Sequence, residues 1–198
     1  MSTRGVVGFR HNGQDKVMYN HSDSYPDYLG LTVLEAVRKY SDEQLIAAHK
    51  KITLVDPDEK PSEELQAQYT KYHCGGVSTG KKSEWYSLLR EAQGNIDAYV
   101  TDDKLAHMIN GRRSMFDSLF SEYAYIINLD DKTLEFYVGF NKDKNAAGRY
   151  ASFTEDPKEA YYGVRLVKAY TFEQVRSAKS VSAIVKDMNK KSEEEDDA

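Results

Sequence analysis

A short polar segment at residues 19–30 carries the groups best suited to chemistry in this sequence. Within it, Asn20 offers an amide, His21 an imidazole and Asp23 a carboxylate, all between an expected strand end and an expected helix start. Polar groups that converge at such a junction often form sites on α+β scaffolds. We therefore predict His21 and Asp23 as candidate catalytic residues.

The neighbouring polar and aromatic side chains are the expected ligand contacts. We predict Arg4, Asn20, Ser24 and Tyr25 as ligand-binding residues, and we expect the polar segment to lie next to Arg4. The same segment also has a purely structural interpretation. Asn, Asp and Ser are the residues that turns favour, and a Tyr-Pro dipeptide is rigid. The sequence leaves both interpretations open.

The N-terminus suggests a second kind of catalytic site. Removal of Met1 leaves Ser2 with a free α-amine beside its hydroxyl, which is the pairing that N-terminal-nucleophile hydrolases use. In that alternative, Asp23 is the carboxylate that the polar turn brings back toward residue 2. The sequence does not show whether Met1 is removed.

Other possible sites are weaker. Residues 75–82 nearly match the phosphate-binding pattern G-x-x-x-x-G-K-[ST] but end in Lys82 where a hydroxyl is needed, so they are interpreted as a loop. Arg149 and Tyr150 fit an approach to an anionic ligand and fit a surface turn equally well. The five histidines lack the H-x-H and H-E-x-x-H spacings, so we predict no metal site and no cofactor.

Composition excludes several classes of protein. The 198 residues include 27 Lys and Arg against 32 Asp and Glu, a net charge of −5 that disfavours direct nucleic-acid binding. The single cysteine, Cys74, excludes an internal disulfide. No apolar run is long enough to span a bilayer and no signal-peptide core is visible, so we expect a cytoplasmic protein without membrane contact. The 15 tyrosines favour a binding surface.

The elements that must position these residues suggest an α+β fold. Residues 5–10 and 15–19 are typical of strands, and Asn12 and Gly13 between them predict a hairpin turn. Residues 123–129 and 133–140 alternate in polarity and form a second hairpin. We predict one antiparallel sheet built from the N-terminal and C-terminal hairpins. Helices from the middle of the chain should pack on one face, and each strand should bury only that face.

We expect one domain over residues 1–189. Residues 190–198 contain two lysines and five acidic residues with no large apolar side chain, and are expected to form a disordered acidic tail.

Several motifs resemble a family of uncharacterised proteins of bacteriophages, prophages and some bacteria. The similarity lies in Thr-Arg-Gly at residues 3–5 with Gly-Phe at 8–9, and in Tyr-Asn-His-x-Asp-Ser-Tyr-Pro at 19–26 with Leu-Gly at 29–30. It continues through residues 85–89, 125–130, 134–140, 148–150 and 162–167. This resemblance implies an accessory protein of a virus or mobile element that acts inside a bacterial cell, and it transfers no activity.

Two functions follow as hypotheses. The first is a non-enzymatic accessory protein that binds a host protein or a small molecule, for example against a host defence system. The alternative is a small hydrolase or transferase built on the N-terminal hairpin and residues 20–25. A deep pocket around Arg4, Asn20, His21 and Asp23 favours an enzyme or a ligand-binding protein, whereas a flat tyrosine-rich face favours a protein partner. The sequence does not specify an oligomeric state.

Overall fold

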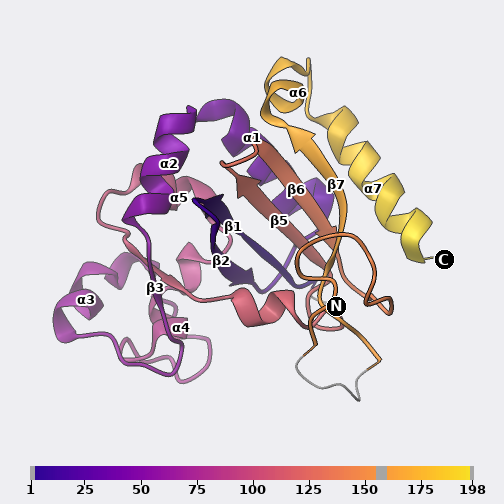
Figure 1. Ribbon diagram of the computed structural model, residues 1–198. Coiled ribbons are helices and arrows are strands. Elements are labelled where there is room, and N and C mark those ends of the chain that lie inside the picture. The colour runs from indigo at the N-terminus through magenta and orange to yellow at the C-terminus, as the bar shows by residue number, and fades with distance from the viewer. Residues whose placement is uncertain (1–2, 155–159, 197–198) are drawn as a thin grey trace.

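A computed structural model describes residues 3–154 and 160–196, with the backbone alone for 193–196. Its main sheet has five strands in the order β2-β1-β5-β6-β7 (Figure 1). The strands are β1 (Gly5–His11), β2 (Gln14–Asn20), β5 (Tyr123–Asn128), β6 (Thr133–Val138) and β7 (Arg165–Thr171). The α+β class and the sheet made of an N-terminal hairpin and C-terminal strands are confirmed.

One pairing in this sheet is parallel. The pairs β1–β2, β5–β6 and β6–β7 are antiparallel as expected, but β1 runs parallel to β5, with Val7 opposite Tyr125. A parallel pair needs a long crossover between its strands. Residues 21–122, which contain the middle helices, provide that crossover.

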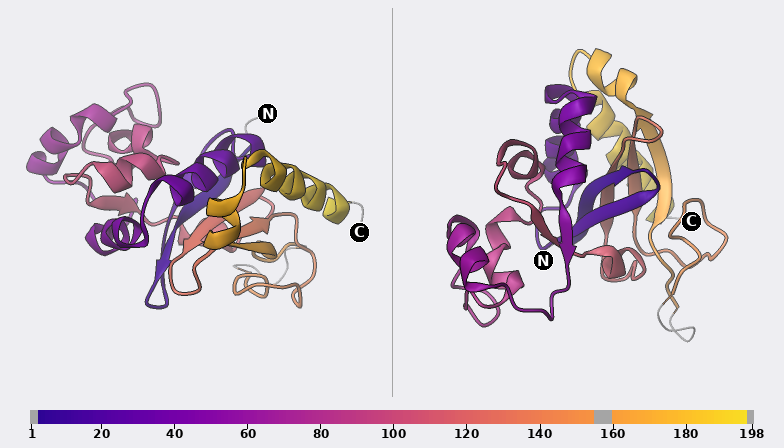
Figure 2. Two further views of the ribbon diagram at one scale, coloured as in Figure 1. Left: turned by 90° about the horizontal axis from the view of Figure 1, so that it is seen from above. Right: turned by 60° about the vertical axis from the view of Figure 1, so that its left-hand side comes forward.

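Helices cover one face of the sheet. Figure 1 and the left panel of Figure 2 show α1 (Leu31–Lys39), α6 (Phe172–Ser177) and α7 (Ser182–Asp196) on the same side. Phe9, Tyr125 and Phe136 point to this side and are fully buried, in one cluster with Val33 of α1 and Val175 of α6. The alternating apolar residues predicted for residues 123–129 and 133–140 form the core face of β5 and β6 as far as Val138. Phe140, which was predicted on the same face, follows the end of β6 and is 43% exposed, so that part of the prediction is wrong.

The rest of the crossover lies beyond β2. It contains α2 (Asp42–Lys51), β3 (Thr53–Val55), α3 (Glu63–Gln68), α4 (Trp85–Leu88), α5 (Ile96–Thr101) and β4 (His107–Ile109), with short helical turns η1 (Pro26–Gly30), η2 (Thr70–Tyr72), η3 (Arg90–Ala92) and η4 (Arg112–Met115). Strands β3 and β4 form a small parallel sheet. The Gly111 N–H donates to the Val17 carbonyl of β2 (2.8 Å), which joins this part to the main sheet. No helix in the described residues has the length and apolar content needed to cross a membrane.

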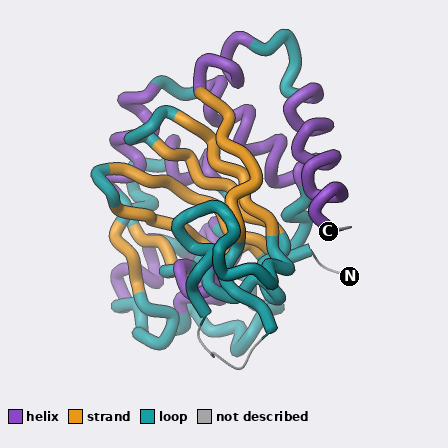
Figure 3. Tube along the Cα trace, turned by 45° about the vertical axis from the view of Figure 1, so that its right-hand side comes forward, coloured by secondary structure: helices purple, strands orange, loops and turns teal. Residues whose placement is uncertain are grey.

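The second face of the sheet is also covered. Figure 3 shows the loop that follows β6 crossing the strands on the side opposite the helices. Asn128 (1% exposed), Glu135 (6%) and Tyr137 (0%) point to this second face and are buried under the loop. The expectation that each strand buries only one face is therefore wrong for β5 and β6. The alternating pattern predicted that this second face is exposed to solvent, but the loop covers it and supplies polar partners for its side chains.

The two hairpins are joined at their turns. Asn12 (φ 50°) and Gly13 (φ 72°) adopt the left-handed conformation of the predicted tight turn. The Asp130 carboxylate, in the β5–β6 turn, accepts hydrogen bonds from the backbone N–H groups of Asn12 (2.7 Å) and Gly13 (2.9 Å). Because both contacts lie at the end of the parallel β1–β5 pair, they fix its register.

The predicted tail boundary falls inside a helix. α7 continues through Asp196, past the expected end of the folded region at residue 189. Ser192 is 6% exposed, and its hydroxyl donates to the Asn189 carbonyl (2.7 Å). The last two residues of the predicted tail, 197 and 198, lie outside the described residues.

Replacing Asp130 should weaken the joint between the hairpins. Asp130→Ala removes the acceptor of two backbone N–H groups, so we expect the free energy of unfolding to fall by about 1–2 kcal/mol. Asp130→Asn keeps one acceptor and should lose less. Urea denaturation measures both, with the exposed Asp103→Ala as a control that should match the wild type. A stability unchanged in Asp130→Ala contradicts this role.

Candidate functional site

The predicted polar segment begins at the end of β2 and is tied down by two of its own residues. The Asn20 Nδ2 group donates to the Ser22 carbonyl and to the Ser24 hydroxyl (2.9 Å). Ser24 is fully buried, its N–H donates to the Thr3 carbonyl (3.2 Å), and its carbonyl accepts from the Tyr125 hydroxyl (2.9 Å). Of the predicted ligand contacts, Asn20 and Ser24 therefore build the turn, and Ser24 is closed to a ligand.

Asp23 and Tyr25 are the predicted residues that face solvent. Asp23 has φ 55°, a conformation that Asp tolerates, and its carbonyl accepts from the Leu29 N–H (3.2 Å). Its exposed carboxylate accepts no hydrogen bond from the described residues. Tyr25 is 41% exposed and leans toward Tyr123, with 6.0 Å between ring centroids. Both side chains are available to a partner.

A shallow hollow of about 380 Å³ lies beside the turn and is wide open to solvent. Asn20 and Asp23 form one wall, Tyr28 forms the rim, and Glu91 and Asn95 lie across from them. Sequence reasoning missed this second wall because it is about 70 residues away along the chain. The signal for it is Gly94, which has φ 76° and where a Cβ atom would lie 2.3 Å from the Asn20 Oδ1 atom.

Arg4 and His21 belong to a different group of side chains. Neither lines the hollow. The Tyr19 hydroxyl and His21 Nδ1 are 3.0 Å apart, and the Arg4 guanidinium carbon lies 4.4 Å from the centroid of the Phe120 ring. Phe120 in turn stacks on Tyr19 at 5.3 Å. The predicted site residues thus divide between the hollow and this aromatic group, so the two predicted catalytic residues, His21 and Asp23, have different surroundings.

The N-terminal-nucleophile alternative depends on Ser2, which lies outside the described residues. The bond from the Ser24 N–H to the Thr3 carbonyl does place the polar turn beside the start of the chain. The proposed roles of Ser2 and of Asp23 in that alternative stay predictions.

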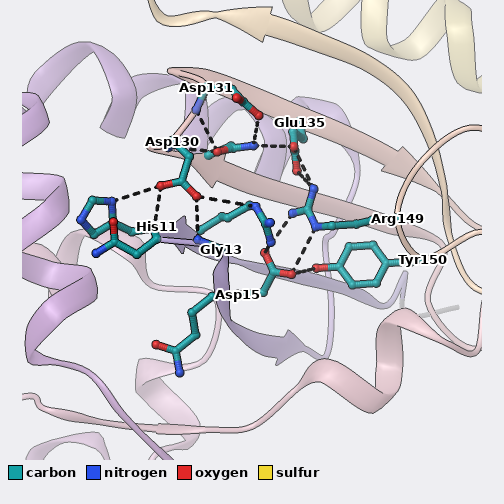
Figure 4. Close-up of polar contacts among 12 residues, drawn as sticks. His11, Gly13, Asp15, Asp130, Asp131, Glu135, Arg149 and Tyr150 are labelled. Carbon is teal, nitrogen blue, oxygen red and sulfur yellow. Dashed lines mark hydrogen bonds and ion pairs between the residues drawn. The ribbon is translucent and has the colours of Figure 1, made fainter.

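A network of charged residues lies at the other end of the strands, on the loop-covered face (Figure 4). The Arg149 guanidinium lies between two carboxylates, with Nη2 2.9 Å from Asp15 Oδ1 on β2 and Nη1 2.7 Å from Glu135 Oε2 on β6. Tyr150 donates to Asp15 (2.6 Å) and Tyr137 to Glu135 (2.9 Å). Arg149 and Tyr150 do lie in a turn, and there both side chains bind carboxylates of the protein itself.

Nearby groups complete the network. The Asn128 Nδ2 group donates to Glu135 (2.7 Å) and to Asp131 (2.9 Å), and Arg10 Nη1 is 3.1 Å from Asp15 Oδ1. Burial by itself raises the pKa of Asp15, but hydrogen bonds from Arg149 and Tyr150, with the Arg149 charge, bring it below its usual value. Burial raises the pKa of Tyr150. The lowered pKa of Asp15 and the raised pKa of Tyr150 keep the carboxylate charged and the phenol neutral near neutral pH, which suits a structural role better than proton transfer.

The glycine-rich loop at residues 75–82 holds an internal carboxylate. Glu84 accepts hydrogen bonds from the hydroxyls of Ser78 (2.6 Å), Thr79 (2.7 Å) and Ser87 (2.9 Å). The bonds from Ser78 and Thr79 lower the pKa of Glu84 to about 2. A phosphate-binding loop of this type follows a strand, whereas this segment follows η2. The interpretation of residues 75–82 as an ordinary loop therefore agrees with the structure. The His73 Nε2 atom is 3.0 Å from the Gly80 carbonyl oxygen, so its ring is engaged there.

Within the part of the chain that is described, no group of three or more His, Cys, Asp or Glu side chains is placed to hold a metal ion.

The Arg149 bridge should be a main contributor to stability. Arg149→Met leaves Asp15 and Glu135 buried without their shared cation, and breaking such a buried pair costs about 3 kcal/mol or more. We expect a loss of that size in the free energy of unfolding measured in urea. The exposed Arg38→Met on α1 is the matched control and should change little. Equal stabilities for the two variants argue against the bridge.

The same network predicts an acid-dependent loss of stability. The folded pKa of Asp15 lies below its ordinary value of 3.8, so its ionised form stabilises the protein above that pH. The contribution is lost as the pH falls through the folded pKa. Between about pH 5 and pH 2, the free energy of unfolding should therefore fall less steeply in Asp15→Asn than in the wild type. Parallel pH profiles would show that Asp15 does not contribute.

Comparisons with protein-family models, with curated proteins and with solved structures each give no match. The resemblance of the motifs to a phage and bacterial family therefore stays a prediction, and function must be argued from the surface itself.

Proposed function

We propose that this protein is a non-enzymatic binding module that contacts a partner protein through the surface around its polar turn. This turn surface consists of Asp23, Tyr25, Tyr28, Glu91 and Asn95. The observation that supports it best is the combination of a shallow, open hollow with a tyrosine at its rim that is 62% exposed, Tyr28. Small-molecule sites enclose most of their ligand, and this hollow does not.

The side chains of the turn surface suit a protein partner. Tyr25 and Tyr28 combine a large apolar area with a hydroxyl, which is the property that enriches tyrosine at interfaces. The charged groups that line the hollow are the carboxylates of Asp23 and Glu91, while Asn20 and Asn95 present amides. This combination favours a partner segment that presents a lysine or arginine side chain together with backbone polar groups.

The setting that we propose is the cytoplasm of a bacterial cell, with a host protein as the partner and a phage or mobile element as the source of this chain. The support is the motif resemblance, together with the absence from the described residues of a helix that could cross a membrane. Interference with a host defence system is one role that such a protein would have.

Two substitutions test the turn surface without altering the fold. Tyr28→Ala and Asp23→Asn change exposed side chains, and Asn tolerates the positive φ of residue 23, so both variants should unfold at the wild-type temperature. Tagged wild-type protein should retain a specific partner from a lysate of the bacterial host. Each variant should retain at least about tenfold less, which corresponds to the loss of about 1.4 kcal/mol of binding free energy.

The matched control is Leu119→Ala, which removes another exposed apolar side chain elsewhere (51% exposed) and should keep the partner. A partner retained equally by all four proteins would place the interface elsewhere. Retention of a small molecule in place of a protein would overturn the protein-partner assignment.

A further inference from the structure

A second hollow lies between the tip of the β1–β2 hairpin and the end of the small β3–β4 sheet. It has a volume of about 490 Å³ and is more enclosed than the hollow beside the polar turn. A volume of this size lies in the range of small-molecule sites. We call it the hairpin hollow, and it is lined by residues 12–15, Leu54, Asn110 and Arg112.

Hydrogen bonds fix both walls of the hairpin hollow. The hairpin turn is one wall, and Asp130 holds its backbone N–H groups, as Figure 4 shows. In the opposite wall, the Asn110 N–H donates to the Val55 carbonyl (3.0 Å) and the Arg112 N–H donates to Asn110 Oδ1 (3.1 Å). A ligand therefore meets walls that are already ordered, which lowers the entropy cost of binding.

Arg112 gives the hairpin hollow a positive charge that the protein does not neutralise. Among the described residues, no carboxylate forms an ion pair with Arg112, whose guanidinium carbon lies 5.7 Å from the centroid of the Phe116 ring. Asp15 also lines the hollow, but Arg10 and Arg149 already contact its carboxylate. The hollow therefore offers one positive charge to a ligand.

Side-chain amides form most of the remaining lining. The amides of Asn12 and Gln14 form no hydrogen bond with the described residues. Asn110 uses its Oδ1 atom for Arg112, so its Nδ2 group is left to donate. Amides both donate and accept, which matches hydroxyl or amide groups on a ligand. Leu54 is the one large apolar side chain among the lining residues, so an apolar ligand would gain little here.

We propose that the hairpin hollow binds a small carboxylic acid whose other groups are hydroxyls or amides. The guanidinium fork of Arg112 matches the two oxygens of a carboxylate, and one positive charge balances one carboxylate. The amides of the lining pair with the other polar groups of the acid. This site goes beyond the proposed function and shares no residue with the turn surface, so either proposal can fail without the other.

Titration of the full chain with glucuronate, a sugar acid with one carboxylate and several hydroxyls, tests the site by ¹H–¹⁵N NMR. The wild type should show saturable shifts at residues 12–15 and 110–112. Glucose lacks the carboxylate and hexanoate lacks the hydroxyls, so each should bind at least about tenfold more weakly. Equal binding of glucose, of hexanoate or of inorganic phosphate would overturn the assigned ligand chemistry.

Two exposed residues of the lining provide the decisive variants. Arg112→Gln removes the cation and should weaken glucuronate binding at least about tenfold. Asn110→Asp keeps the acceptor for the Arg112 N–H but adds a negative charge, so it should weaken binding by a similar factor. Arg112→Lys keeps the charge without the fork and should fall between Arg112→Gln and the wild type. The matched control is Arg38→Gln on α1, also exposed, which should bind glucuronate like the wild type.

Thermal unfolding of each variant checks that the fold is kept, and Asn110→Asp decides the outcome if Arg112→Gln does not fold. Absence of saturable glucuronate binding to the wild type contradicts the site. The same holds if binding is unchanged in the folded variants of Arg112 and Asn110. Shifts confined to residues 23–28 would place the ligand at the polar turn and would also refute the hairpin hollow.

Discussion

The Arg149 guanidinium between Asp15 and Glu135 is the interaction on which the central part of this structure depends. It joins β6 and the loop that follows β6 to β2, which is far away in the chain. Without it, Glu135 would be buried on the second face of the sheet with no cation and Asp15 would keep only Arg10, which is strongly unfavourable. With it, the loop can lie across the strands, so β5 and β6 are covered on both faces.

The two ends of the sheet differ in how their polar side chains are used. At the end with the two hairpin turns, every acidic group has internal partners: Asp130 holds the backbone of Asn12 and Gly13, and Asn128 connects Glu135 to Asp131. At the opposite end, where β1 begins and β2 ends, the side chains of Asp23, Tyr25 and Tyr28 are exposed, so the turn surface lies there.

Within the polar turn, some residues fix the backbone and others face solvent. Asn20 and Ser24 use their hydrogen bonds to fix the backbone, and the close approach of Gly94 to Asn20 brings the second wall of the hollow into place. The side chains of Asp23 and Tyr25 therefore point to solvent from a backbone that hydrogen bonds hold in place. A partner that meets this surface pays little ordering entropy, because the turn is already fixed.

The sequence by itself determined the elements that depend on local patterns. Alternation in β5 and β6 identified the core face, Asn12 with Gly13 identified the first hairpin, and the polar composition of residues 19–30 identified a turn at the end of β2. The tertiary structure decided everything that depends on residues far apart in the chain: the parallel pairing of β1 with β5, the burial of Glu135 beside Arg149, and the division of Arg4 and His21 from Asp23. The local sequence shows which chemical groups a segment contains. It carries no information on which distant side chain will neutralise a buried carboxylate or form the second wall of the hollow. Those pairings follow from strand order and crossover length, which appear only once the chain is packed.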